Sequence, residues 1–150
     1  MSNFLTQGRQ TLLAELQADA TLDDEVTTWF DWGAGIRKRY NLEPATCPLV
    51  SVVPADLESD SGEDTNVLDA YPQMVEVGVA TAGQNAEPCE NLVVTCLDVI
   101  RAADRDCMGL AEDGLNSVRL VDAAFAAKPK EEGKRIVWLA ALTCRLAWRL

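Results

Sequence analysis

Residues 135–150 read RIVWLAALTCRLAWRL, and this stretch decides the fold. From Ile136 onward, every second side chain is apolar, a period of two that is typical of a β-strand. The opposite face is apolar at first and cationic at its end, where Arg145 and Arg149 lie. Abundant Ala and Leu are compatible with a helix. The β-branched and aromatic start, and the charged turn KPKEEGK at 128–134, instead favour a long strand that closes a hairpin.

The remaining segments place this hairpin in an α+β domain. A helix is expected where apolar residues recur at intervals of three and four, and a strand where they alternate or form a short run bounded by prolines. Gly8 is a weak point of the first helix, and loops are expected at 19–25, 56–66 and 104–114. The expected helices are 3–18 and 86–104, and the expected strands are 26–40 (irregular, with a turn at 33–35), 47–54, 71–83 and 115–127.

This order predicts one domain over residues 1–150, with a mostly antiparallel sheet of four to five strands and two helices packed on one face. A chain of 150 residues is long enough to bury a substantial core, and an apolar fraction of 48% is ordinary for a globular protein. We find no internal repeat and no second domain in the sequence.

Charge is unevenly distributed along the chain, whose formal net charge is −11. No Lys or Arg lies between Arg39 and Arg101, whereas residues 101–150 carry more bases than acids. Such segregation commonly serves solubility, and it also allows the basic surface of one copy to meet the acidic surface of another. General binding of nucleic acid is disfavoured, because it requires clustered positive charge.

The five cysteines include no CxxC pair, and the chain has no histidine. A zinc site is therefore not expected, and the cysteines are interpreted as small buried apolar residues in a protein kept in a reducing cytoplasm. No segment reaches the length of about 20 apolar residues that a membrane helix needs. The first ten residues, MSNFLTQGRQ, do not resemble a secretory signal.

The sequence offers little for catalysis, and neither an enzymatic activity nor a cofactor is expected. The absence of histidine excludes Ser/His/Asp and Cys/His nucleophiles. No phosphate-binding GxxxxGK[ST] motif is present. Residues 56–62 approach the start of a calcium-binding EF-hand loop, but Val67 occupies the position of the essential final Glu. An enzyme with an acidic active site at Asp60 or Asp64 is the weakest of the three function classes considered.

Binding is the more promising class, because aromatic and Arg side chains are those that most often anchor protein interfaces. Trp29 and Trp32 lie close in sequence to Arg37 and Arg39, although a contribution of the aromatics to the core is the simpler interpretation. Arg145 and Arg149 join the set because an edge strand invites pairing unless it is covered. The predicted partner interface comprises Trp29, Trp32, Arg37, Arg39, Lys128, Lys130, Lys134, Arg145 and Arg149.

The order of elements also carries a resemblance. An N-terminal helix is followed by CPLVSVVP, an acidic loop, YPQMVEVGVA, the helix NLVVTCLDVIRAADR and a hairpin ending LTCRLAWRL. This arrangement resembles the tail-terminator and minor tail proteins of long-tailed bacteriophages over nearly the whole chain. It rests on hydrophobicity and element order, which related neck, head-closure and tail-completion proteins share.

The resemblance implies a virion protein made in the host cytoplasm that forms a homo-oligomeric ring, a hexamer. Such a ring ends polymerisation of the tail-tube protein and offers its other face to a head-connector or stopper protein, while DNA passes through without specific binding. Acids lining the lumen would repel the duplex. The cationic last strand and the short acidic loop depart from the family pattern. The alternatives are another neck or head-closure protein, or a small cytoplasmic adaptor that binds a protein or peptide. The candidate lumen acids are Glu58, Asp60, Glu63 and Asp64.

Overall fold

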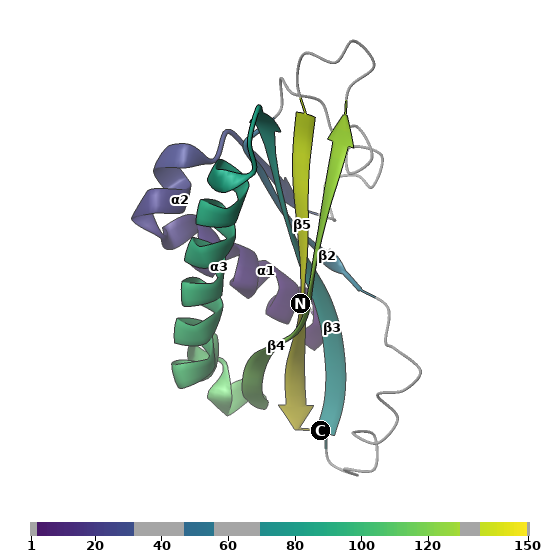
Figure 1. Ribbon diagram of the computed structural model, residues 1–150. Coiled ribbons are helices and arrows are strands. Elements are labelled where there is room, and N and C mark those ends of the chain that lie inside the picture. Colours follow the sequence, from purple (N-terminus) through teal and green to yellow (C-terminus); the bar gives the residue numbers. More distant parts are fainter. Residues whose placement is uncertain (1–2, 32–46, 56–69, 130–135, 150) are drawn as a thin grey trace.

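The computed structural model describes residues 3–31, 47–55, 70–129 and 136–149. They form one five-stranded sheet with the helices on one of its faces (Figure 1), which confirms the predicted α+β class and the two main helices, α1 and α3. The helices are α1 (Phe4–Ala18), α2 (Ala20–Glu25) and α3 (Glu87–Asp106), and short 3-10 turns follow at Cys107–Gly109 and Ala111–Asp113. The strands are β1 (Thr28–Asp31), β2 (Leu49–Pro54), β3 (Ala70–Gly83), β4 (Leu115–Pro129) and β5 (Ile136–Arg149).

The strand order is β1-β2-β3-β5-β4, with β1 parallel to β2 and all other neighbours antiparallel. The last strand, β5, therefore lies inside the sheet. It pairs with β3 from Arg149, opposite Ala70, to Ile136, opposite Gly83, and with β4 along its other side. The prediction that the C-terminal strand is an open edge is wrong, because a hairpin partner and a long central strand occupy both of its sides. The edge strand of the hairpin is β4.

The period of two in β5 reflects burial under the helices. Ala140, Leu142, Cys144, Leu146 and Trp148 are all buried on the face that carries α1 and α3. The valines of β3 at alternate positions 75–79 belong to the same core. The chain thus covers the C-terminal strand with its own helices, so this strand by itself supplies no reason for self-association.

Helix α2 replaces the loop expected at 19–25. Asp19 ends α1 with extended backbone, and its side chain then accepts a 3.0 Å hydrogen bond from the Leu22 backbone N–H to begin α2. Leu22 is fully buried. The prediction failed because one buried apolar residue among six carries no periodic signal, whereas a single capping side chain suffices to start a short helix.

The segment 104–114, also expected to be a loop, contains the last turn of α3 and both 3-10 turns. Cys107 and Met108 adopt left-handed backbone conformations, with φ of 52° and 53°, which is unusual for residues other than glycine. The Met108 side chain is buried in the core. Its burial explains why this turn holds a conformation that local preference disfavours.

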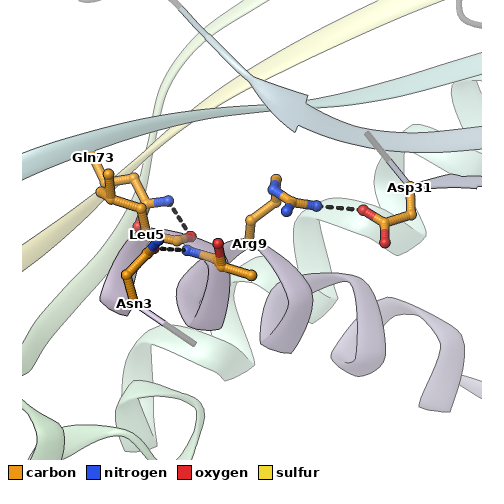
Figure 2. A network of polar contacts seen from close by, with 6 residues as sticks. Asn3, Leu5, Arg9, Asp31 and Gln73 are labelled. Carbon is orange, nitrogen blue, oxygen red and sulfur yellow. Dashed lines mark hydrogen bonds and ion pairs between the residues drawn. The ribbon is translucent and has the colours of Figure 1, made fainter. Parts of the chain in front are cut away.

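Gly8 is required by the close approach of α1 to the sheet. A methyl group at this position would lie 2.7 Å from Gln73 Oε1, 2.8 Å from a ring carbon of Trp148 and 2.9 Å from a methyl carbon of Leu146. Gln73 is held in place because its amide donates to the Leu5 carbonyl oxygen at 2.7 Å (Figure 2). The apparent weak point of the helix is therefore its contact point with the sheet.

Replacing Gly8 with alanine is expected to lower the free energy of unfolding by about 1–3 kcal/mol, because the overpacking exceeds the gain in helix propensity. Alanine at Gln17, an exposed position of the same helix, is the control and should change stability little. Urea denaturation followed by circular dichroism measures both variants. An increase in stability for Gly8→Ala would show that α1 does not approach the sheet this closely.

Strand β1 represents the irregular strand expected at 26–40, and residues 32–40 of that range lie outside the described part of the chain. Arg9 of α1 is buried and forms an ion pair with Asp31 at the end of β1 (Figure 2). This pair attaches the parallel edge strand to the first helix.

Candidate interaction surface

The largest continuous exposed stretch within a strand is residues 119–127 of β4, here called the β4 arm. All nine of its residues are exposed, although most are apolar. Leu120, Val121 and Phe125 are 39%, 42% and 61% exposed. An exposed edge of this kind is a site where another chain can pair or pack.

The arm is exposed because the helix layer covers only the first part of β4. Val118 is 1% exposed, and its backbone N–H donates to the carboxylate of Asp104 at the end of α3, at 2.9 Å. After this contact the register shifts between Leu120 and Asp122, which marks a β-bulge. Within the described part of the chain, β4 pairs only with β5, so the outer edge of the arm has no strand beside it.

Among the described residues, two hollows of about 320 Å³ each flank the arm, and Phe125 lines both. The first is mostly apolar and includes Gly78 and Ser51. A methyl group on Gly78 would lie 2.5 Å from Ser51 Oγ, so small residues create this space. The second hollow separates the arm from the start of α3, where Cys89 and Glu90 contribute to its lining.

Basic side chains gather at and before the start of the arm, on the sheet face opposite the helices. Arg119 lies directly across from Arg145 in the β4–β5 register, and Arg149 follows on the same face of β5. Arg119 and Arg149 are exposed, and Arg145 is half-buried. Like charges on directly opposed positions of neighbouring strands are unfavourable, so an acidic group next to Arg119 would stabilise this arrangement.

The structure brings together only part of the predicted interface. Arg145 and Arg149 share one face of β5. Trp29 is half-buried and packs against the core, in agreement with the simpler interpretation that the aromatic residues contribute to the core. Only the backbone of Lys128 is described. The predicted residues that lie outside the described part of the chain are Trp32, Arg37, Arg39, Lys130 and Lys134 of the interface, and the lumen acids Glu58, Asp60, Glu63 and Asp64.

Sequence reasoning missed the apolar residues of the β4 arm. Leu120 and Phe125 were placed in a strand, but their exposure was not predicted. A signal was present in LVDAAFAA, where the apolar residues do not keep to one side of the alternation. A strand buried on one face separates apolar from polar positions, and the lack of this separation is consistent with an edge.

No cluster of His, Cys, Asp or Glu suited to a metal ion occurs among the described residues. None of the described helices is both long and apolar enough to cross a bilayer. Cys89, Cys96 and Cys144 are buried, as predicted, whereas Cys47 and Cys107 are half-buried. Burial raises the pKa of Cys96 and of Cys144 to about 12 and also raises the pKa of Cys89.

Thiol labelling is expected to separate these two groups. The thiolate is the reactive form, so iodoacetamide at neutral pH should modify Cys47 and Cys107 while Cys96 and Cys144 stay unmodified until the protein unfolds. Because folding raises the pKa of the buried thiols from about 9 to about 12, their contribution to stability is complete below pH 9 and is lost as the pH rises towards 12. Peptide mass spectrometry measures the labelling. Rapid modification of Cys144 in the folded protein would contradict its burial.

No protein-family model matches the chain, and no curated protein matches it. Its structure is similar to a chain of a solved structure described as the virion of a native gene transfer agent particle. The two share a fold. The likeness has a TM-score of 0.56, covers 97% of this chain and 99% of the other, and accompanies 18% sequence identity. It therefore extends over the whole sheet and its helices and is not confined to a common hairpin.

Proposed function

We propose that this chain is a structural subunit of a phage-like virion and has no enzymatic activity. One observation carries the proposal, namely the nearly full-length likeness of its fold to a chain from the virion of a gene transfer agent. The exposed β4 arm adds support, because a subunit of an assembled particle must present surfaces that are bare in the isolated chain.

Within the virion, we assign the chain to the top of the tail tube, as a tail terminator that forms a homo-oligomeric ring. This role agrees with the resemblance in element order. The ring, with six copies as the resemblance implies, ends tube polymerisation and joins the tail to a head connector. Glu58, Asp60, Glu63 and Asp64 are assigned to its lumen, where their charge would keep DNA sliding without specific binding.

The alternative role is that of another neck or head-closure component, which would share the fold without ending the tube. A peptide-binding adaptor has less support, because Trp29, one of its two proposed anchors, packs against the protein's own core. The remaining anchor, Trp32, lies outside the described residues.

Assembly of tail tubes in the presence of this protein tests the proposal. The tail-tube protein whose gene lies nearest to the gene of this protein is polymerised in the presence and absence of this protein. Negative-stain electron microscopy records the lengths and the ends of the tubes. A terminator gives shorter tubes with added density at one end. Normal tube lengths with binding only to connector proteins favour the neck role. Failure to bind tubes or connectors, together with a monomeric mass in light scattering alone and with tubes, overturns the virion role.

A further inference from the structure

We propose that the β4 arm of one copy docks head to tail on the α2 edge of the next copy, where the α2 edge means α2 and β1, residues 20–31. The inference rests on the proposed function, since that function requires copies to join side by side in a ring. The inference names the two surfaces that form the contact between copies and the opposite charges that attract each other across it.

The arm lacks the usual protections of an edge strand. Natural edges are kept short, carry several charges or prolines, or are covered by another element. The arm has nine exposed residues, of which only Arg119 and Asp122 are charged. Leu120, Val121 and Phe125 present large apolar side chains to solvent. Contact with another copy would cover them.

Charge favours the α2 edge as the part of the second copy that the arm meets. Arg119 is exposed at the start of the arm and lies across from Arg145 in the β4–β5 register. Helix α2 ends in three exposed acids, Asp23, Asp24 and Glu25, and no Lys or Arg lies between Arg9 and Arg37 in the sequence. Two copies of net charge −11 repel each other overall, so a contact that pairs a basic surface with an acidic one is favoured.

The sheet places these two surfaces at opposite ends of one molecule. β4 and β1 are the two terminal strands in the order β1-β2-β3-β5-β4, and α2 immediately precedes β1. A contact between unlike edges leaves one of each free on the growing assembly, so it continues from copy to copy and forms a ring when the rotation between copies closes. A symmetric contact between two β4 arms would stop at two copies.

Photocrosslinking of the full chain tests the docking directly. Phe125 is replaced by the photoreactive residue p-benzoylphenylalanine, which preserves the aromatic ring, and the irradiated protein is separated by mass before digestion. Trypsin releases residues 10–37, which contain the whole α2 edge, as one peptide. Crosslinks from position 125 to this peptide in the dimeric and larger bands support the docking. The same residue placed at Val94, which is 57% exposed on α3, is the matched control and should give few such crosslinks.

Charge reversal provides the second test. Arg119→Glu is expected to weaken association between copies about five- to tenfold, because it replaces attraction to the α2 acids by repulsion. Adding Asp23→Arg and Asp24→Arg to the same chain should restore association. The control is Arg101→Glu, because the Arg101 side chain lies on α3 and is 71% exposed. This variant should leave association between copies unchanged.

The possible outcomes separate this inference from the proposed function. Crosslinks between two peptides that both contain position 125 indicate a symmetric contact and overturn the docking. Rings that form normally with Arg119→Glu, without crosslinks from position 125 to residues 10–37, also overturn the docking but leave the ring intact. A chain that stays monomeric both alone and with tail tubes overturns the ring and the docking together.

Discussion

Replacing Trp148 with alanine is expected to lower the free energy of unfolding by about 3–5 kcal/mol, because it empties the space of the largest fully buried side chain. Trp148 is 1% exposed, and its indole contacts the ring of Phe4 in an edge-on arrangement with centroids 5.3 Å apart. Its N–H donates to Gln73 Oε1 at 2.8 Å. The loss therefore includes apolar contacts, an aromatic pair and a buried hydrogen bond.

Two variants separate these contributions. Trp148→Phe keeps much of the ring but leaves Gln73 Oε1 without its donor, and should cost about 1–3 kcal/mol. Trp138→Ala removes a half-buried tryptophan from the same face of β5, and its loss should be clearly smaller. Guanidinium unfolding followed by far-ultraviolet circular dichroism is the measurement, since fluorescence changes when a tryptophan is removed. Equal losses for Trp148→Ala and Trp138→Ala would contradict the assignment of Trp148 to the centre of the core.

Asp31→Ala is expected to lower the free energy of unfolding by about 3 kcal/mol, because it removes a carboxylate that pairs with the buried guanidinium of Arg9. The side chain of Arg9 is only 7% exposed, and that of Asp31 is 31% exposed. Removing the more accessible partner is thus the harsher change, since the charge that remains is the one shielded from water. The loss should be concentrated where α1 meets β1.

The matched control is Asp98→Ala. Asp98 also pairs with an arginine, Arg101, at 3.7 Å, but both side chains are more than half exposed and the pair lies on the surface of α3. Solvent screens such pairs, so its loss should be close to zero. Urea unfolding compares the two variants, and hydrogen exchange locates the change. If Asp31→Ala and Asp98→Ala lose the same amount, the Arg9–Asp31 pair does not stabilise the edge of the sheet.

Much of the fold could be predicted from local patterns. The alternation in β5, the proline-bounded run in β2 and the three-and-four spacing in α3 each identified an element close to its observed bounds. These signals are reliable because burial of one face imposes its period on the sequence. α2 was missed because its single buried residue, Leu22, imposes no period.

The candidate surface was predicted only in part. Arg145 and Arg149 were correctly placed together on one face of β5, because alternation fixes the face of every residue in a strand. Their strand was nevertheless assigned to the sheet edge, since position at the end of the chain was taken for position at the end of the sheet. Nothing in the local pattern of a strand records which strands lie on its two sides.

The sequence alone determined the period of each long strand and helix, the apolar face of β5 and the uneven charge, because these are properties of residues close in the chain. Only the tertiary structure decided that β5 lies inside the sheet, that Gly8 lies against Trp148, and that the β4 arm is exposed to solvent. These depend on contacts between residues far apart in sequence, such as Gln73 with Leu5 and Arg9 with Asp31. Strand order and exposure follow from which distant segments pack together, and no local period encodes that choice.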